Sequence, residues 1–152
     1  MNIEKKWFHD LTKEELFEMY RLRIDIFVVE QECAYQEIDD FDLTALHVFV
    51  RDDEGVLVGY GRVYDAGDFN TFGRVLILPA LRNQALGSLL VQTLIDTIKT
   101  TLKDKPIYIH AIASLQNFYE KRGFKPMGPV VVEDGIEHID MEYIGSVEPK
   151  DQ

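Results

Sequence analysis

An apolar run that ends at a proline and leads into a helical pattern is the feature that most restricts the fold of this chain. Residues 75–78 read Val-Leu-Ile-Leu, and Pro79 follows. Proline has no backbone N–H, so a central strand has to end there. From Leu86 the apolar residues recur with helical spacing, at Leu86, Leu89, Leu90, Leu94 and Ile98. A strand that feeds a helix through a tight connection is typical of an α/β domain.

The connection between this strand and this helix is suited to bind an anion. The first backbone N–H groups of a helix have no partner within the helix, and the helix dipole is positive at that end. Arg82 adds a fixed positive charge. Ala85, Gly87 and Ser88 are small, so a phosphate group can approach the backbone closely. An ordinary strand–loop–helix unit without a ligand is the alternative interpretation.

Charge is distributed unevenly along the sequence. The formal net charge is −11, which argues against a general nucleic-acid-binding protein. Residues 70–130 nevertheless carry 8 Lys or Arg and 3 Asp or Glu, a net charge of +5. This basic middle coincides with the expected anion site. The acidic segments on either side suit a cationic partner, although surface charge of this kind usually serves solubility alone.

Hydrophobic periodicity and turn signals predict an α/β domain with a mixed sheet. We expect helices over residues 13–27, 86–102 and 115–121, and strands over 3–8, 46–51, 56–63, 72–78, 106–111, 130–133 and 138–143, with a further strand from Phe124. The sheet should hold about six to seven strands, flanked by helices, in the order β-α-β-β-β-α-β-α-β-β. The strand at 106–111 follows a helix at βαβ spacing, so a parallel neighbour is expected. Gly59 and Gly61 indicate a bulge or close packing within their strand. The length predicts one domain, residues 1–145, with a tail at 146–152.

The strand–loop–helix unit resembles the acyl-CoA pyrophosphate loop of the GNAT acetyltransferases. That family carries Arg or Gln followed by x-x-Gly-x-Gly/Ala after a strand, and residues 82–87 read Arg-Asn-Gln-Ala-Leu-Gly. Ala85 stands at the first glycine, which requires a negative φ at this position. The order and length of the expected elements also match the GNAT fold over nearly the whole chain.

The resemblance implies acetyl-CoA as a cosubstrate. It assigns the pyrophosphate to the loop and first helical turn, formed by Arg82, Asn83, Gln84, Ala85, Leu86, Gly87 and Ser88. It assigns the pantetheine arm to the preceding strand, where backbone groups of Leu76, Ile77 and Leu78 pair with it as an added strand does. One backbone N–H of that strand would polarise the thioester carbonyl.

A second block lies at residues 115–124, which read Leu-Gln-Asn-Phe-Tyr-Glu-Lys-Arg-Gly-Phe. GNAT enzymes commonly carry Phe-Tyr-x-x-x-Gly-Phe at this distance behind the loop. The resemblance implies that Tyr119 is a general acid, which gives a proton to the leaving CoA thiolate. It implies that Asn117 hydrogen-bonds the cosubstrate. The alternative is that Phe118 and Tyr119 are core aromatics of an amphipathic helix.

The longest block covers residues 27–39, which read Phe-Val-Val-Glu-Gln-Glu-Cys-Ala-Tyr-Gln-Glu-Ile-Asp. It resembles the ElaA branch of the GNAT family, and residues 133–138, Glu-Asp-Gly-Ile-Glu-His, support the same branch. The branch implies acyl-CoA-dependent transfer to an amine by direct attack. It leaves the acceptor open, as a small-molecule or a protein amine.

A base has to take a proton from the amine before it attacks. Glu30, Glu37 and His47 are the candidates, because a neutral histidine accepts directly and a carboxylate accepts through water. The alternatives are structural: Glu30 bonds loop N–H groups, and His47 is a strand-end histidine with a local partner. The acidic segment 30–42 is expected to line the acceptor side of a cleft, opposite the phosphate loop.

Two other chemistries are not expected. Asp39, Asp40 and Asp42 lie close together, with His47 beyond, but their spacing is not that of a calcium loop, so no metal is predicted. Cys33 lies among carboxylates, which disfavour a thiolate, so a buried thiol is expected instead of a nucleophile.

The sequence predicts a cytoplasmic protein. Its single cysteine cannot form an internal disulfide, no run of 18 apolar residues occurs, and the first residues lack the apolar segment of a signal peptide. We therefore expect no membrane and no nucleic-acid partner, and a homodimer is compatible with the sequence. Two rival functions stay open: a CoA-binding regulatory module without catalysis, and an interaction domain that binds no cofactor.

Overall fold

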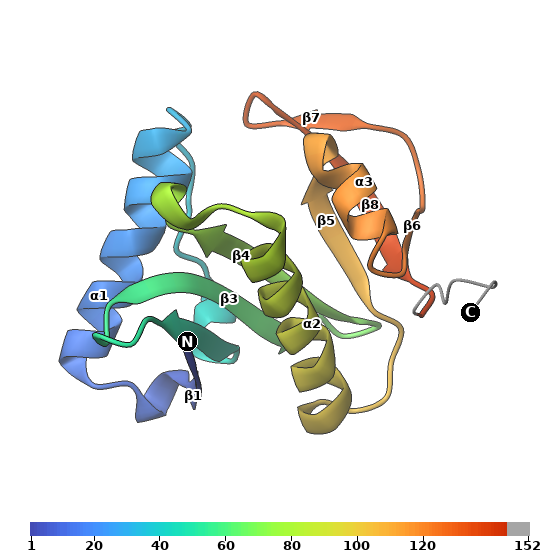
Figure 1. The fold of residues 1–152 in the computed structure, drawn as a ribbon. Helices are drawn as coiled ribbons and strands as arrows, with labels where there is room; N and C mark the ends of the chain where they lie inside the picture. Colours follow the sequence, from blue (N-terminus) through green and yellow to red (C-terminus); the bar gives the residue numbers. More distant parts are fainter. Residues whose placement is uncertain (146–152) are drawn as a thin grey trace.

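Residues 1–145 form two four-stranded sheets with flanking helices, which we describe from a computed structural model (Figure 1). The structure describes residues 1–145, and the expected tail at 146–152 lies outside the described residues. The first sheet has the antiparallel order β1-β2-β3-β4, with bounds Asn2–Trp7, Leu46–Arg51, Leu57–Asp65 and Asn70–Ile77. In the second sheet, β8 (Ile136–Tyr143) pairs with β5 (Tyr108–Ile112), β6 (Phe124–Pro126) and β7 (Val131–Glu133). The predicted α/β class and order of elements are confirmed.

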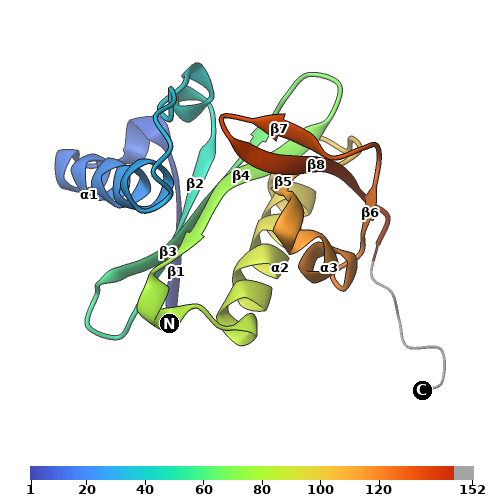
Figure 2. The same cartoon turned by 90° about the horizontal axis from the view of Figure 1, so that it is seen from above.

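The two sheets meet where β4 and β5 begin and then diverge (Figure 2). A parallel bridge joins Asn70 to Ile107, and the Asn70 N–H donates to the Pro106 carbonyl at 2.8 Å. The Asn70 side chain also donates to the Lys103 carbonyl at 2.7 Å, which ties the start of β4 to the connection before β5. The expected parallel neighbour is therefore present, but its pairing stops at the bridge and the strands continue into separate sheets.

Helices cover both faces of the first sheet, with α1 (Lys13–Ile24) on one face and α2 (Gln84–Thr101) on the other (Figure 2). Successive residues of β2 supply the two cores: Phe49 packs with Met19 of α1, while Val48 and Val50 pack with the apolar face of α2. Gly61 of β3 faces α2, and a Cβ there would lie 2.8 Å from Leu94. Close packing at this glycine is therefore confirmed. Within residues 1–145, no helix is both long and apolar enough to cross a membrane.

The first helix begins as expected and ends differently. Thr12 accepts from the Glu15 N–H while Glu15 accepts from the Thr12 N–H, which forms a capping box. The sequence predicted a helix to residue 27. Instead α1 ends at Ile24, and the chain continues as a wider π-helix over Asp25–Glu30. The α-helix therefore ends before the predicted residue 27, whereas the helical stretch as a whole, with the π-helix included, continues past it to Glu30.

A buried arginine–carboxylate network ties the segment after this helix to the first sheet. Its members are Arg23, Glu37, Asp39, Asp42, Arg62 and Arg74. Arg23 of α1 binds Asp42 through two N···O contacts of 2.7 and 3.0 Å, and its Nε lies 2.8 Å from Glu37. Arg62 of β3 binds Asp39 and also reaches Asp42 at 2.8 Å. The short helical turn Asp40–Leu43 is thereby held against β3.

Asp42 should be the most sensitive position of this network. Burial alone would raise its pKa, but hydrogen bonds and charges from Arg23 and Arg62 outweigh burial and hold the pKa of Asp42 below its ordinary value. A lowered carboxylate pKa adds stability that is complete above the ordinary pKa of 3.8 and is lost as pH falls through the lowered value.

We predict that Asp42→Asn lowers the free energy of unfolding by about 3–5 kcal/mol, because it leaves buried guanidinium charge without a matching carboxylate. The effect should be seen in urea unfolding at neutral pH and should shrink below about pH 4. Asp40→Asn is the matched control, since Asp40 is exposed in the same turn. Equal free energies of unfolding in the two variants would contradict the predicted contribution of Asp42 to stability.

Candidate active site

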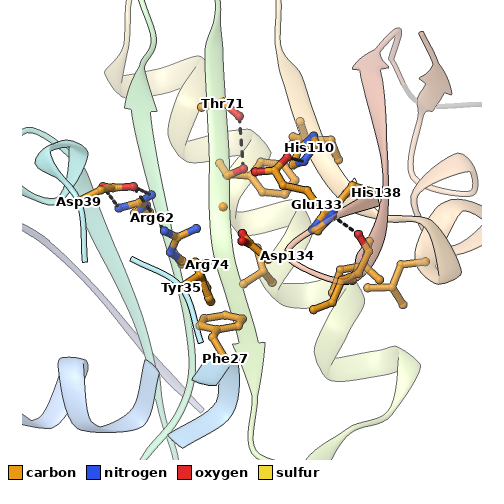
Figure 3. Close-up of a pocket in the computed structure, with 18 of the residues that line it drawn as sticks. Phe27, Tyr35, Asp39, Arg62, Thr71, Arg74, His110, Glu133, Asp134 and His138 are labelled. Atoms are coloured by element: carbon orange, nitrogen blue, oxygen red, sulfur yellow. Dashed lines mark hydrogen bonds and ion pairs between the residues drawn. The ribbon is translucent and has the colours of Figure 1, made fainter. Parts of the chain in front are cut away.

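A cavity of about 650 Å³ opens between the diverging sheets (Figure 3). Its walls come from the segment 27–41, β4, β5 and the turn between β7 and β8. The aromatic side chains that line it are Phe27, Tyr35, Phe41, Tyr64, Phe72 and Tyr119. Its charged and titratable lining includes Arg62, Arg74, His110, Glu133, Asp134 and His138. A cleft of this size and composition can hold an organic molecule with a polar group.

Tyr119 reaches this cavity from α3 (Gln116–Glu120). Its ring packs against Phe72, Phe118 and Phe124. Tyr119 is therefore both a core aromatic residue and part of the cavity wall. Burial raises the pKa of Tyr119 to about 12, and the positive charge of Arg122 offsets part of that rise. The hydroxyl therefore keeps its proton throughout the neutral range, as a proton donor requires.

Arg82 is engaged at the predicted phosphate loop. Its Nε donates to the Ile77 carbonyl at 2.9 Å, and its Nη2 lies 2.8 Å from a Glu30 carboxylate oxygen. The side chains of Arg82 and Glu30 are 44% and 36% exposed. An ion pair this exposed contributes little to stability, so an arriving phosphate can replace the carboxylate at small cost.

The backbone of β4 next to Arg82 faces two directions. The Leu78 N–H donates to the Val58 carbonyl at 2.9 Å, so it points into the first sheet. Backbone groups alternate along an antiparallel strand, so the N–H and C=O of Ile77 point the opposite way, towards the diverging edge. The backbone groups of Leu76 turn back to β3. Of the three residues predicted along the pantetheine arm, Ile77 alone turns both backbone groups to the open edge.

The first turn of α2 is held by its own cap. Asn83 Oδ1 accepts from the Leu86 N–H at 2.9 Å, Asn83 Nδ2 donates to the Leu81 carbonyl, and the Gly87 N–H donates to the Asn83 carbonyl at 3.1 Å. These bonds use the Asn83 side chain and two amides that were predicted for the cosubstrate. Ala85 is helical, so it replaces a glycine without strain. The side chain of Gln84 lies outside what the structure describes.

Gly87 contacts α3, and Ser88 contacts Arg122 just after that helix. A Cβ on Gly87 would lie 3.3 Å from the Phe118 ring, so the glycine allows α2 to approach α3 closely. Ser88 Oγ accepts a hydrogen bond from Arg122, whose guanidinium lies 3.7 Å from the centre of the Phe118 ring. Arg122 is a second cation beside the first turn of α2, and it was not among the predicted site residues. The basic middle of the chain was the signal that pointed to it.

Two of the three predicted bases are buried away from the cavity, which corrects the prediction. His47 is 0% exposed, and its ring nitrogens lie 2.5 Å from the Tyr60 hydroxyl and 2.9 Å from the Asp42 carbonyl. Burial lowers the pKa of His47. Glu37 is also buried, between Arg23 and Arg74. A base that takes a proton from a substrate has to touch it, and neither side chain lines the cleft.

The acidic segment was predicted opposite the phosphate loop, and this is wrong for Glu30, which pairs with Arg82 in that loop. Cys33, Tyr35 and Asp39 of the same segment do line the cavity. Cys33 is buried, as predicted, and its thiol donates to the Asp134 carbonyl at 3.2 Å. Asn117 is exposed on α3, and its predicted contact with the cosubstrate stays a prediction.

A histidine that the sequence analysis missed lies on the other wall of the cavity. His110 of β5 has Nδ1 2.6 Å from Asp140 of β8 and Nε2 2.9 Å from Glu133 of β7. Figure 3 shows His110 with Glu133 and His138 beside it. The ring of His138 stacks on it with centroids 4.5 Å apart and an angle of 7°. Within residues 1–145, no group of three or more His, Cys, Asp and Glu side chains is arranged to hold a metal ion.

Comparison with known proteins gives consistent matches over nearly the whole chain. A family model described as an acetyltransferase (GNAT) domain matches residues 10–144. Protein ElaA of Escherichia coli (strain K12) is 40% identical over 138 residues, which cover 87% of this chain and 89% of that protein. The crystal structure of Escherichia coli ElaA matches with a TM-score of 0.87 and 36% identity, over 93% of this chain and 99% of that one. An acyl-CoA N-acyltransferase from Pseudomonas aeruginosa matches with a TM-score of 0.86 and 36% identity, over 93% and 97%.

The Arg82–Glu30 pair generates a prediction with opposite signs for its two members. Arg82→Ala should weaken acetyl-CoA binding by about 1.5–3 kcal/mol, the scale of a hydrogen bond to a charged group. Glu30→Gln should tighten it by up to about fivefold, because it removes the competing carboxylate. Calorimetry at two salt concentrations measures both effects.

Glu32→Gln is the matched control for Glu30→Gln, since it removes the same charge from an exposed position two residues away. If both variants bind acetyl-CoA more tightly by the same factor, the gain comes from the change in net charge and not from the loss of the Arg82–Glu30 ion pair. Unchanged affinity in Arg82→Ala would remove Arg82 from the phosphate site.

Proposed function

This chain belongs to the GNAT acetyltransferase family, and we propose that it transfers an acyl group, acetyl in the first instance, from acyl-CoA to an amine. The observation that carries the proposal is the cavity between β4 and β5, with Tyr119 in its wall and Arg82 at the end of the neighbouring strand. Tyr119 thus supplies a proton donor in the cavity wall, and Arg82 supplies a cation at the Ile77 end of β4.

The residues present fit an acyl-CoA molecule. Arg82 and Arg122 supply two guanidinium groups at the first turn of α2, suited to a diphosphate. The backbone of Ile77 faces the open edge of β4 and can pair with an extended amide-bearing arm. The capped amides of Leu86 and Gly87 do not take part, so the guanidinium groups carry most of the anion binding in this proposal.

The reaction proceeds by direct attack of the neutral amine on the thioester carbonyl. A backbone N–H on the open edge of β4 hydrogen-bonds the carbonyl oxygen as negative charge develops there. Tyr119 donates a hydrogen bond, and then a proton, to the sulfur as it leaves. A phenol with a pKa of about 12 is a weaker acid than a thiol, so solvent has to return the proton to Tyr119 and complete the transfer.

Two measurements test the proposal. Acetyl-CoA should raise the melting temperature, since a ligand that binds the native state stabilises it. A panel of amines should then release free CoA thiol. A thermal shift without thiol release would favour a CoA-binding regulatory module, and the absence of any shift would favour an interaction domain without a cofactor.

Tyr119→Phe is predicted to lower kcat by about 100-fold while acetyl-CoA affinity stays nearly unchanged, because the variant loses the proton donor and keeps the ring packing. Single-turnover measurement avoids masking by slow product release. Tyr108→Phe, on β5 next to Phe69, is the control. Wild-type single-turnover rates in Tyr119→Phe would exclude Tyr119 from the chemistry.

A further inference from the structure

We infer that His110 is the general base that takes a proton from the acceptor amine, and that Asp140 positions it. The inference rests on the proposed acyl transfer. It assigns the role of base, which the buried His47 and Glu37 cannot fill, to a residue that lines the cavity. His110 lines the same cavity as Tyr119, and its side chain is 45% exposed. His47, by contrast, is 0% exposed.

The place of His110 in the fold brings it to the cleft. Residue 107 closes the bridge to β4, and the strand that follows, Tyr108–Ile112, runs along the diverging edge. The alternation of a strand points Ile109 and Ala111 into the core, where both are buried, and turns His110 away from it. The register of β5 with β8 sets His110 directly opposite Asp140.

Contacts on three sides fix the ring. Nδ1 lies 2.6 Å from Asp140, so its N–H donates to that carboxylate, and the lone pair of the neutral imidazole stands on Nε2 once the Glu133 carboxylate, 2.9 Å away, turns to an arriving ammonium group. His138 stacks on the ring, and its own Nδ1 lies 2.9 Å from the Ile136 carbonyl, which holds the stack in place. A base with a fixed tautomer and a fixed plane presents its lone pair in one direction.

Glu133 makes that direction suitable for an ammonium ion. Its carboxylate lies 2.9 Å from Nε2 and is 59% exposed on the edge strand β7. An ammonium group that pairs with Glu133 brings an N–H next to Nε2. Asp134 lies beside Glu133 in the cavity wall, and Arg74 stands among the cavity-lining residues with its charge matched by Glu37 and Asp39.

The proton balance is complete without a further reactant. The ammonium N–H bond breaks, its proton moves to Nε2, and the free amine forms a C–N bond with the thioester carbon while the C–S bond breaks. Tyr119 gives its hydroxyl proton to the sulfur, and the second N–H proton, which the nitrogen loses as the amide forms, passes through solvent to the Tyr119 oxygen and restores the hydroxyl. The product amide, CoA thiol and one proton result, and His110 passes that proton to solvent.

The test compares kcat/KM for the amine across about pH 5 to 9, at saturating acetyl-CoA, in four proteins. The groups that face His110 in this profile are Asp140, Glu133 and His138. His110→Gln should lower kcat/KM by about 100-fold and remove the acidic limb, with acetyl-CoA affinity unchanged. Asp140→Asn should lower kcat about tenfold and shift the acidic limb without changing the KM for acetyl-CoA. His9→Gln, on an exposed residue outside the cavity lining, should match the wild type.

Each outcome decides the inference. Wild-type activity and an intact acidic limb in His110→Gln would overturn it and leave the proposed transferase function standing. If the wild type binds acetyl-CoA and releases no thiol with any amine, both the transfer and its base are overturned. If His110→Gln does not fold, Asp140→Asn replaces it: an unshifted limb there contradicts the inference, and a shifted limb supports it.

Discussion

The divergence of β4 from β5 is the constraint on which the rest of the molecule depends. Asn70 bridges the two strands at their start, and beyond it each continues in its own sheet. A strand edge that leaves its neighbour exposes backbone N–H and C=O groups, and these need partners. Arg82 supplies one by donating to the Ile77 carbonyl. The fold therefore creates, by separating two strands, the row of backbone groups that an extended ligand can use.

The wall opposite β5 depends on buried charge. The segment 31–45 contains a 3-10 turn over Asp40–Leu43 and otherwise little regular structure, and the arginine–carboxylate network fixes it to α1, β3 and β4. Three guanidinium groups against three carboxylates keep the cluster neutral, which burial requires. Arg74 sits at φ 52°, a strained conformation for an arginine, at a bulge of β4 where it reaches the Glu37 carbonyl at 2.8 Å. Gly73, Arg74 and Val75 of this bulge line the cavity.

Local patterns predicted most of the fold, and long-range pairing decided the parts that were missed. The Thr12–Glu15 capping box, the glycine facing α2 and the strands of the first sheet all follow from residues close in sequence. Glu37 and His47 carried the right chemistry for a base, but whether they face the cleft depends on partners such as Arg23, Arg74 and Tyr60, 13 to 37 residues away. His110 was missed for the same reason, since Asp140 and Glu133 come to it only through the pairing of β8.

The degree of burial decides which ion pairs of this protein can give up one partner to a ligand and which cannot. Arg23, Glu37 and Asp42 have side chains at most 1% exposed, so removing one partner leaves a charge that water cannot reach. Arg82 and Glu30 are 44% and 36% exposed, and water solvates either partner once they part. A protein with a net charge of −11 repels an anionic cosubstrate at long range, so it needs local cations that can change partners. The buried network fixes the segment that lines the cleft. The exposed Arg82–Glu30 pair supplies a guanidinium group that can exchange its carboxylate partner for a phosphate.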